Sequence, residues 1–201
     1  MKLAHHFRAL TALPCWGVDW DPPVNLSLNF GKPRLKIREP IRDRPGRSPA
    51  LRLAYSHRQI VVRGQWWLWL FWSRWTLSIR GLEPVRSTSS RRRIQPALRL
   101  LDGQRLVDAT LLSRARTRFE FDLGAVLDVR GLDNHTDEAV WSLYQPRGRI
   151  LSIRTDDSFS FGPGNKPSKY QPIETLPESL ANKSLQTVEH LGRSAPSVVR
   201  R

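Results

Sequence analysis

The stretch Trp66-Trp67-Leu68-Trp69-Leu70-Phe71-Trp72 decides the fold of this chain, because together with Trp75 it gathers five of the eight tryptophans. A transmembrane helix needs about 20 apolar residues, and Arg63 and Arg74 bound a much shorter run here, so the run does not span a bilayer. Indole rings also favour the headgroup region of a membrane, which leaves peripheral anchoring as one interpretation. A central strand that is buried on both faces gives the same continuous apolar pattern. The run favours this second interpretation.

Alternating segments around the run predict a strand-rich domain. Phe119-Glu120-Phe121-Asp122 switches between apolar and charged side chains, as a half-buried strand does. Further strands are expected at 25–30, 34–39, 60–62, 75–79, 106–112, 126–129, 141–144, 150–154 and 159–161. Their apolar faces should share one core. We expect five large side chains to be buried together in that core: Trp67, Trp69, Phe119, Phe121 and Trp141.

One short helix is expected, roughly over residues 93–101. Four apolar residues recur there at helical spacing, the preceding serines offer N-cap hydroxyls, and Gly103 follows at the usual C-terminal position. Pro96 is tolerated only in the first turn of a helix, which keeps the helix short. The predicted fold class is therefore α+β, with a mostly antiparallel β-sheet, one short helix and disordered ends.

The length of 201 residues suggests one domain with appendages. Fifteen prolines and a net charge of +15 indicate that part of the chain does not pack. We expect a flexible leader over residues 1–24, a single α+β domain over 25–165 and a disordered tail over 166–201. Lys2 and Arg8 imitate a secretory signal, but the histidines between them interrupt its apolar region.

Cysteine and histidine usage limit the chemistry of the chain. Cys15 is the only cysteine, so an intramolecular disulfide and a cysteine-rich zinc site are excluded, and a cytoplasmic setting is expected. His135 lies among acidic residues that a divalent cation accepts, although such a composition is equally ordinary for an exposed loop. No H-E-x-x-H, G-x-S-x-G or glycine-rich phosphate motif occurs. We therefore expect neither enzymatic activity nor a cofactor.

Charge is distributed unevenly along the chain. Residues 32–63 hold ten basic side chains against two acidic ones, and residues 119–138 hold six acidic side chains against one arginine. Opposite-sign segments suggest a partner surface, although ordinary solvated faces give the same pattern. The acidic candidate for a protein-binding site consists of Glu120, Asp128, Asp133, Asp137 and Glu138. The basic candidate for a nucleic-acid-binding site, where arginines attract phosphate, consists of Arg34, Lys36, Arg38, Arg91, Arg92 and Arg93.

The joint spacing of several short motifs resembles a family of small, uncharacterised bacterial proteins. The similarity covers roughly residues 25–165 and rests on Gly64-Gln65-Trp66-Trp67-Leu68-Trp69-Leu70, Leu101-Asp102-Gly103-Gln104-Arg105-Leu106, Phe119-Glu120-Phe121-Asp122-Leu123-Gly124 and Trp141-Ser142-Leu143-Tyr144-Gln145-Pro146-Arg147-Gly148. The second half is also similar to β-rich domains among bacterial toxin-immunity proteins. The resemblance implies the fold and a bacterial setting, and it implies no catalytic residue.

Two functions of different classes follow from these patterns. The first is a non-catalytic protein-binding module, in one form an immunity protein, whose acidic segment meets a basic partner such as a toxin. The alternative is a basic nucleic-acid-binding accessory protein, whose affinity would be largely non-specific. The sequence leaves the oligomeric state open.

Overall fold

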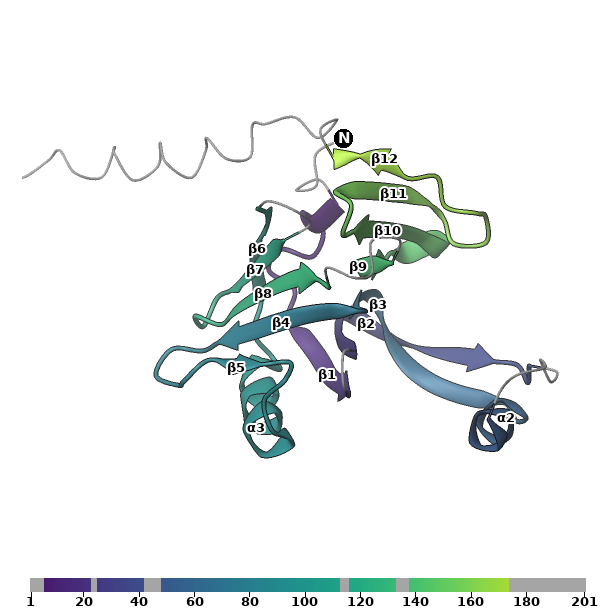
Figure 1. The fold of residues 1–201 in the computed structure, drawn as a ribbon, viewed down its shortest axis with the longest axis horizontal. Coiled ribbons are helices and arrows are strands. Elements are labelled where there is room, and N and C mark those ends of the chain that lie inside the picture. The colour runs from purple at the N-terminus through teal and green to yellow at the C-terminus, as the bar shows by residue number, and fades with distance from the viewer. Residues whose placement is uncertain (1–5, 23–24, 42–47, 113–115, 133–137, 174–201) are drawn as a thin grey trace, which may run out of the picture.

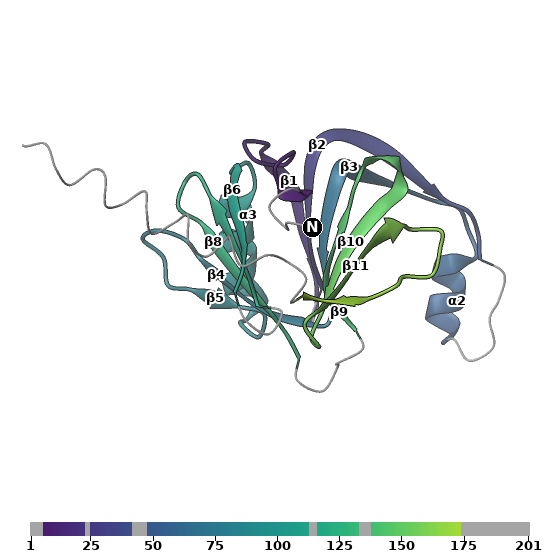
Figure 2. The ribbon, with the colours of Figure 1, turned by 90° about the horizontal axis from the view of Figure 1, so that it is seen from above.

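The computed structural model describes residues 6–22, 25–41, 48–112, 116–132 and 138–173, which form two antiparallel β-sheets (Figure 1). The sheets face each other across a shared core, as the view from above shows (Figure 2). The predicted fold class, mostly antiparallel sheet with little helix, is confirmed. Among the described residues, no helix is long and apolar enough to cross a membrane.

The larger sheet contains seven strands. Their order across the sheet is β1 (Cys15–Asp21), β2 (Asn25–Arg38), β3 (Gln59–Leu70), β9 (Ala139–Tyr144), β10 (Arg149–Arg154), β11 (Ser158–Pro163) and β12 (Gln171–Pro172). The smaller sheet contains five strands in the order β5 (Val85–Arg86), β4 (Ser73–Ser78), β8 (Val126–Gly131), β7 (Thr117–Phe121) and β6 (Leu106–Leu111). The aromatic run ends β3, and Trp72, with a φ of +47°, turns the chain into β4 of the other sheet.

The aromatic run alternates across the sheet, which corrects part of the expected core. Leu68 and Leu70 point inward and are 1% and 0% exposed, so Trp67 and Trp69 lie on the outer face. Trp67 is shielded there by neighbouring rings and Trp69 is half-buried. Phe119, Phe121 and Trp141 do belong to the core. Because Leu68 and Leu70 occupy the inner face of β3, Trp67 and Trp69 point to its other face and do not join the cluster of the other three residues.

Trp141 joins the two sheets through the core. Its ring is fully buried and its Nε1–H donates to the hydroxyl of Thr117 on β7 at 2.8 Å. Phe7 and Phe119 pack edge-on against the same indole, with ring centres 5.6 and 6.0 Å away. This contact therefore satisfies the polar groups of two buried side chains and fixes how the sheets face each other.

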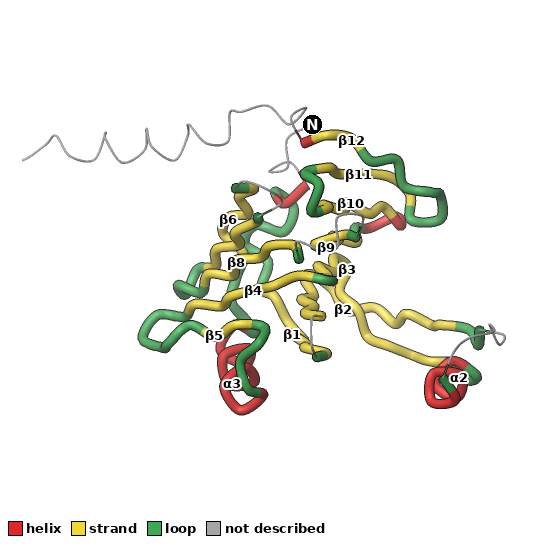
Figure 3. Tube along the Cα trace, viewed as in Figure 1, coloured by secondary structure: helices red, strands yellow, loops and turns green. Residues whose placement is uncertain are grey.

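The helices α2 and α3 accompany the sheets (Figure 3). α3 (Arg91–Leu101) buries the four apolar residues that predicted it and ends before Gly103, whose φ is +93°. It begins earlier than expected, so that Pro96 lies in its second turn, and Ser90 makes no side-chain cap hydrogen bond. α2 (Pro49–Tyr55) was not expected, and a 3₁₀ turn, η1 (Pro146–Gly148), joins β9 to β10.

The N-terminal segment is part of the fold, so the expected flexible leader over residues 1–24 is wrong for the described part. Cys15–Asp21 forms β1 at the edge of the larger sheet. Phe7 and Leu10 are 3% and 0% exposed and belong to the core. Gly17 adopts a φ of +55° where the register of β1 shifts. This bulge breaks the alternation by which a strand is recognised in a sequence.

The other end of the described chain also extends the expected domain. β12 pairs with β11 beyond residue 165, and Ile173 packs against the core. The remaining parts of the expected disordered ends, residues 1–5 and 174–201, lie outside the described residues.

Candidate functional site

The paired strands β2 and β3 continue beyond the core as a two-stranded arm (Figure 1). The arm runs from the pair Pro33–Gly64 to the pair Arg38–Gln59. β1 and β9, which flank these strands within the sheet, pair only with their other ends. Within the described residues, both outer edges of the arm are therefore unpaired, and α2 lies at its far end (Figure 3).

Gly64 marks the point where the sheet becomes the arm. A Cβ at this position would lie 2.5 Å from the carbonyl oxygen of Trp66 and 2.6 Å from that of Phe30. The Gly64 N–H donates to Asn29 Oδ1 at 2.9 Å, beside a register shift between Phe30 and Pro33. Only glycine fits at this bulge, which redirects the two strands away from the core.

One face of the arm carries an apolar ladder, which consists of Leu35, Ile37, Ile60 and Val62. Leu35 lies opposite Val62 and Ile37 opposite Ile60, so the four side chains share one face. In chain order they are 68%, 56%, 61% and 49% exposed. On β3 the ladder continues the face that carries Leu68 in the core, past the region that the smaller sheet covers. Four such side chains present on the order of 400 Å² of apolar surface, and patches of this size on monomers are often functional.

The opposite face of the arm is basic and packs against aromatic rings. Lys36 Nζ lies 5.6 Å from the ring centre of Trp67, and the Arg63 guanidinium lies 4.8 Å from it. Burial, followed by the charges of neighbouring arginines, lowers the pKa of Lys36, and burial lowers the pKa of Arg63. Trp67 also stacks on Tyr144 and Trp69, with ring centres 4.5 and 5.3 Å away. At 6% exposure, Trp67 has almost no ring surface left on which a nucleic-acid base can stack.

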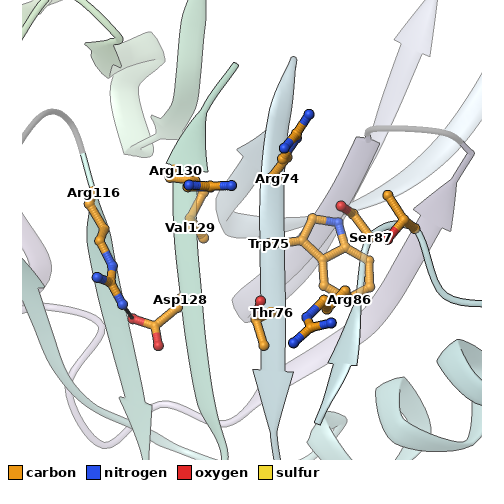
Figure 4. Close-up of a pocket in the computed structure, with 10 residues that line it drawn as sticks. Arg74, Trp75, Thr76, Arg86, Ser87, Arg116, Asp128, Val129 and Arg130 are labelled. Carbon is orange, nitrogen blue, oxygen red and sulfur yellow. Dashed lines mark ion pairs between the residues drawn. The ribbon is translucent and has the colours of Figure 1, made fainter. Parts of the chain in front are cut away.

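A second feature is a cavity of about 510 Å³ at the smaller sheet (Figure 4). Its walls come from β4, from β8, from β5 with the residues that follow it, and from the residue before β7. Four guanidiniums and one carboxylate line it: Arg74, Arg86, Arg116, Arg130 and Asp128. Thr76, Ser87 and Thr88 add hydroxyl groups.

Asp128 is the shared partner of two arginines. The Arg118 guanidinium donates to both carboxylate oxygens at 3.0 Å, and Arg116 Nη2 lies 3.7 Å from Oδ1. The hydrogen bonds from Arg118 to Asp128 raise the pKa of that guanidinium. Asp128 therefore offers little free negative charge to a partner.

Three further arginines that line the cavity have no carboxylate partner among the described residues. Arg74 lies directly opposite Arg130 in the ladder between β4 and β8, and Arg86 lies opposite Thr76 in the ladder between β4 and β5. Like charges that face each other across a ladder destabilise a sheet. The face therefore carries uncompensated positive charge around the cavity.

The structure separates the acidic residues that the sequence suggested as a protein-binding site. Glu120 is exposed on β7, Asp128 lies on β8 among arginines, and Glu138 is exposed just before β9. Asp133 and Asp137 lie outside the described residues. The described members therefore give no continuous acidic surface.

The basic candidates divide into two groups. Arg34, Lys36 and Arg38 share the basic face of the arm with Arg63. The run of residues 91–93 forms the exposed first turn of α3, which lies apart from the arm (Figure 1). In the described part of the chain, the two groups therefore lie on separate parts of the molecule.

The apolar ladder and the unpaired arginines of the cavity were not identified from the sequence. Alternation of Leu35 and Ile37 with basic residues was visible, but it marks a strand without saying what covers its apolar side. Arg74 and Arg130 lie far apart in the chain, and only strand pairing brings them together.

The described residues contain no candidate metal-binding cluster. No group of three histidine, cysteine, aspartate or glutamate residues that could hold a metal occurs within the described ranges, and His135 lies outside them. Comparisons with protein-family models, with curated proteins and with solved structures find no match for this chain, so its role is argued from the geometry above.

Proposed function

We propose that this protein is a non-catalytic binding module whose arm docks a partner protein through the apolar ladder. The observation that carries the proposal is the continuation of the core face of β3 into solvent at Ile60 and Val62. Apolar surface contributes about 25 cal/mol per Å² when it leaves water, so the ladder offers on the order of 10 kcal/mol before the costs of association. A partner would cover the ladder in the same way as the smaller sheet covers the inner face of the larger sheet in the core.

The charges of the arm indicate what kind of partner fits. On the face behind the ladder, Lys36 and Arg63 lie against the Trp67 ring, whereas Arg34 and Arg38 are exposed and have side chains long enough to reach around a strand edge. Two such arms packed together would place like charges side by side, which disfavours a second copy of this chain. The proposed partner is therefore a protein with an apolar strip bordered by carboxylates. The proposed partner surface is therefore acidic, whereas the acidic segment of the sequence suggested a basic partner.

The unpaired edges of the arm offer a second element of recognition. A partner strand can add to an exposed sheet edge by main-chain hydrogen bonds, and side chains of the edge then give specificity. Lysine and arginine on such an edge also prevent uncontrolled pairing with other strands. If the resemblance to immunity-type domains extends to function, the partner is a toxin with an acidic contact surface.

Site-specific photo-crosslinking tests the proposal. A photoreactive amino acid replaces Ile37 in one variant and Leu123 in a control, because Leu123 is an equally apolar, 71% exposed residue in the turn between β7 and β8. We expect Ile37 to yield one discrete product with a second protein in the native host, and Leu123 to yield none. The captured protein is then purified, and its direct binding is measured.

Each other product of the Ile37 variant contradicts the proposal. A crosslinked dimer of this chain assigns the ladder to self-association. An intramolecular product that disappears in a chain ending at Ile173 assigns it to the protein's own C-terminal residues. Equal products from Ile37 and Leu123 indicate non-specific adhesion.

Nucleic-acid binding is the second candidate function, and the basic face of the arm favours it. Its affinity should fall with salt, with a slope of about −0.9 per neutralised phosphate. Binding that persists at about 0.2 M salt and is lost when Arg34, Lys36 and Arg38 are neutralised would place this function first. The shielding of Trp67 makes that outcome the less expected one.

A further inference from the structure

We infer that the arginine-lined cavity of the smaller sheet binds a small phosphomonoester, independently of the arm. The cavity, of about 510 Å³, lies within the range of roughly 300–1,000 Å³ that is usual for small-molecule sites. It is formed by side chains from separate strands, as Figure 4 shows, and not by one flexible loop.

The charge of the cavity identifies the ligand as an anion with more than one negative charge. Arg74, Arg86 and Arg130 line it without a carboxylate partner among the described residues, whereas Asp128 is already shared by two other arginines. A single carboxylate ligand would leave most of this positive charge uncompensated. A phosphomonoester carries about −1.5 to −2 charges at pH 7 and three acceptor oxygens, so it can serve several guanidiniums at once.

Strand pairing places Arg74 and Arg130 directly opposite each other, so an anion bound between their side chains would stabilise the sheet. Like charges opposite each other in a ladder are destabilising, and neither arginine forms an ion pair with a described carboxylate. The planar guanidinium donates two parallel hydrogen bonds to a phosphate, which lysine cannot do. The hydroxyls of Ser87 and Thr88 supply further donors at the wall.

Calorimetric titration in phosphate-free buffer tests the inference with glycerol phosphate as the probe. We expect saturable binding of one phosphomonoester per chain. The double variant Arg74→Gln, Arg130→Gln should weaken it at least tenfold. The double variant Arg92→Gln, Arg99→Gln is the matched control, because it removes the same charge from two exposed arginines of α3. We expect it to change the affinity for glycerol phosphate less than twofold.

The pH dependence and the thermal stability provide independent readouts. Phosphomonoesters take up a second proton near pH 6, so glycerol phosphate should bind more weakly at pH 5 than at pH 7.5, whereas sulfate should show no such change. In anion-free buffer, Arg130→Gln should keep or raise the melting temperature, because it removes the repulsion from Arg74. A lower melting temperature would show that Arg130 serves stability and would overturn the inference.

Three other results also overturn it. Equal losses in the cavity variant and the α3 control would mean that net charge alone attracts the probe. Binding of a ten-nucleotide single strand without binding of glycerol phosphate would assign the arginines to a polynucleotide. No saturable binding of glycerol phosphate at millimolar concentration would leave the arginines as an ordinary solvated face.

Discussion

The hydrogen bond between Trp141 and Thr117 should account for a measurable part of the cohesion between the two sheets. The indole Nε1–H donates to the threonine hydroxyl at 2.8 Å, and both residues are 0% exposed. Neither group can turn to water when its partner is removed. We therefore expect the losses in unfolding free energy of the single variants Trp141→Phe and Thr117→Val to sum to more than the loss in the double variant.

The magnitudes follow from burial. Removal of a whole buried Trp side chain costs about 3–5 kcal/mol, and Phe keeps much of the ring, so the packing loss of Trp141→Phe is about 1–2 kcal/mol. An unsatisfied buried partner adds about 1–3 kcal/mol to each single variant. The double variant leaves neither group unsatisfied, so both penalties disappear and we expect a coupling energy of at least about 2 kcal/mol between the two positions.

Urea unfolding of the four proteins measures this coupling, with the free energy of unfolding extrapolated to water. Thr110→Val on β6 with Trp141→Phe is a matched control, because Thr110 lies on the outer side of the smaller sheet and its hydroxyl contacts Asp108. That control pair should be additive. Additivity of the Trp141 and Thr117 variants within about 0.5 kcal/mol would refute the reasoning.

Three further predictions concern the N-terminal segment, the cysteine and the start of the arm. Deletion of residues 1–22 should abolish cooperative unfolding, because it removes β1 and the buried Phe7; a stable shortened chain in circular dichroism melts would contradict this. Burial raises the pKa of Cys15 to about 12, so the native thiol should not react with a thiol reagent at pH 8, and rapid labelling would show that it is accessible. Gly64→Ala should cost about 1–3 kcal/mol through backbone overlap, and unchanged urea stability would indicate that the bulge relaxes freely.

Local patterns predicted much of the secondary structure. The alternation of Phe119 and Phe121 placed β7 correctly, and helical spacing placed α3, because each signal depends on neighbours in the chain. Two predicted strands at 25–30 and 34–39 form the single strand β2, since the bulge before Pro33 interrupts its alternation without ending the pairing.

The features that bear on function depend on pairing between distant segments. The same alternation at Leu35 and Ile37 describes a strand over a core and a strand in solvent, so exposure of the ladder could not be deduced. Within the smaller sheet, the pairing of β8 with β4 brings Arg74 beside Arg130, and the pairing of β8 with β7 gives Asp128 its partner Arg118. Net charge along the chain cannot show such compensation.

The central claim is tested most directly by the affinity of ladder variants for the protein that is captured by crosslinking at Ile37. Ile37→Asp places a carboxylate on the ladder, and Ile37 is 56% exposed outside the core, so the fold should remain intact. Leu123→Asp makes the same chemical change at a 71% exposed position in the turn between β7 and β8. Burial of one aliphatic side chain is worth about 1.5–3 kcal/mol, and an unpaired buried carboxylate costs more. The account predicts that Ile37→Asp raises the dissociation constant at least 100-fold while Leu123→Asp changes it less than twofold; equal affinity of all three proteins would contradict it.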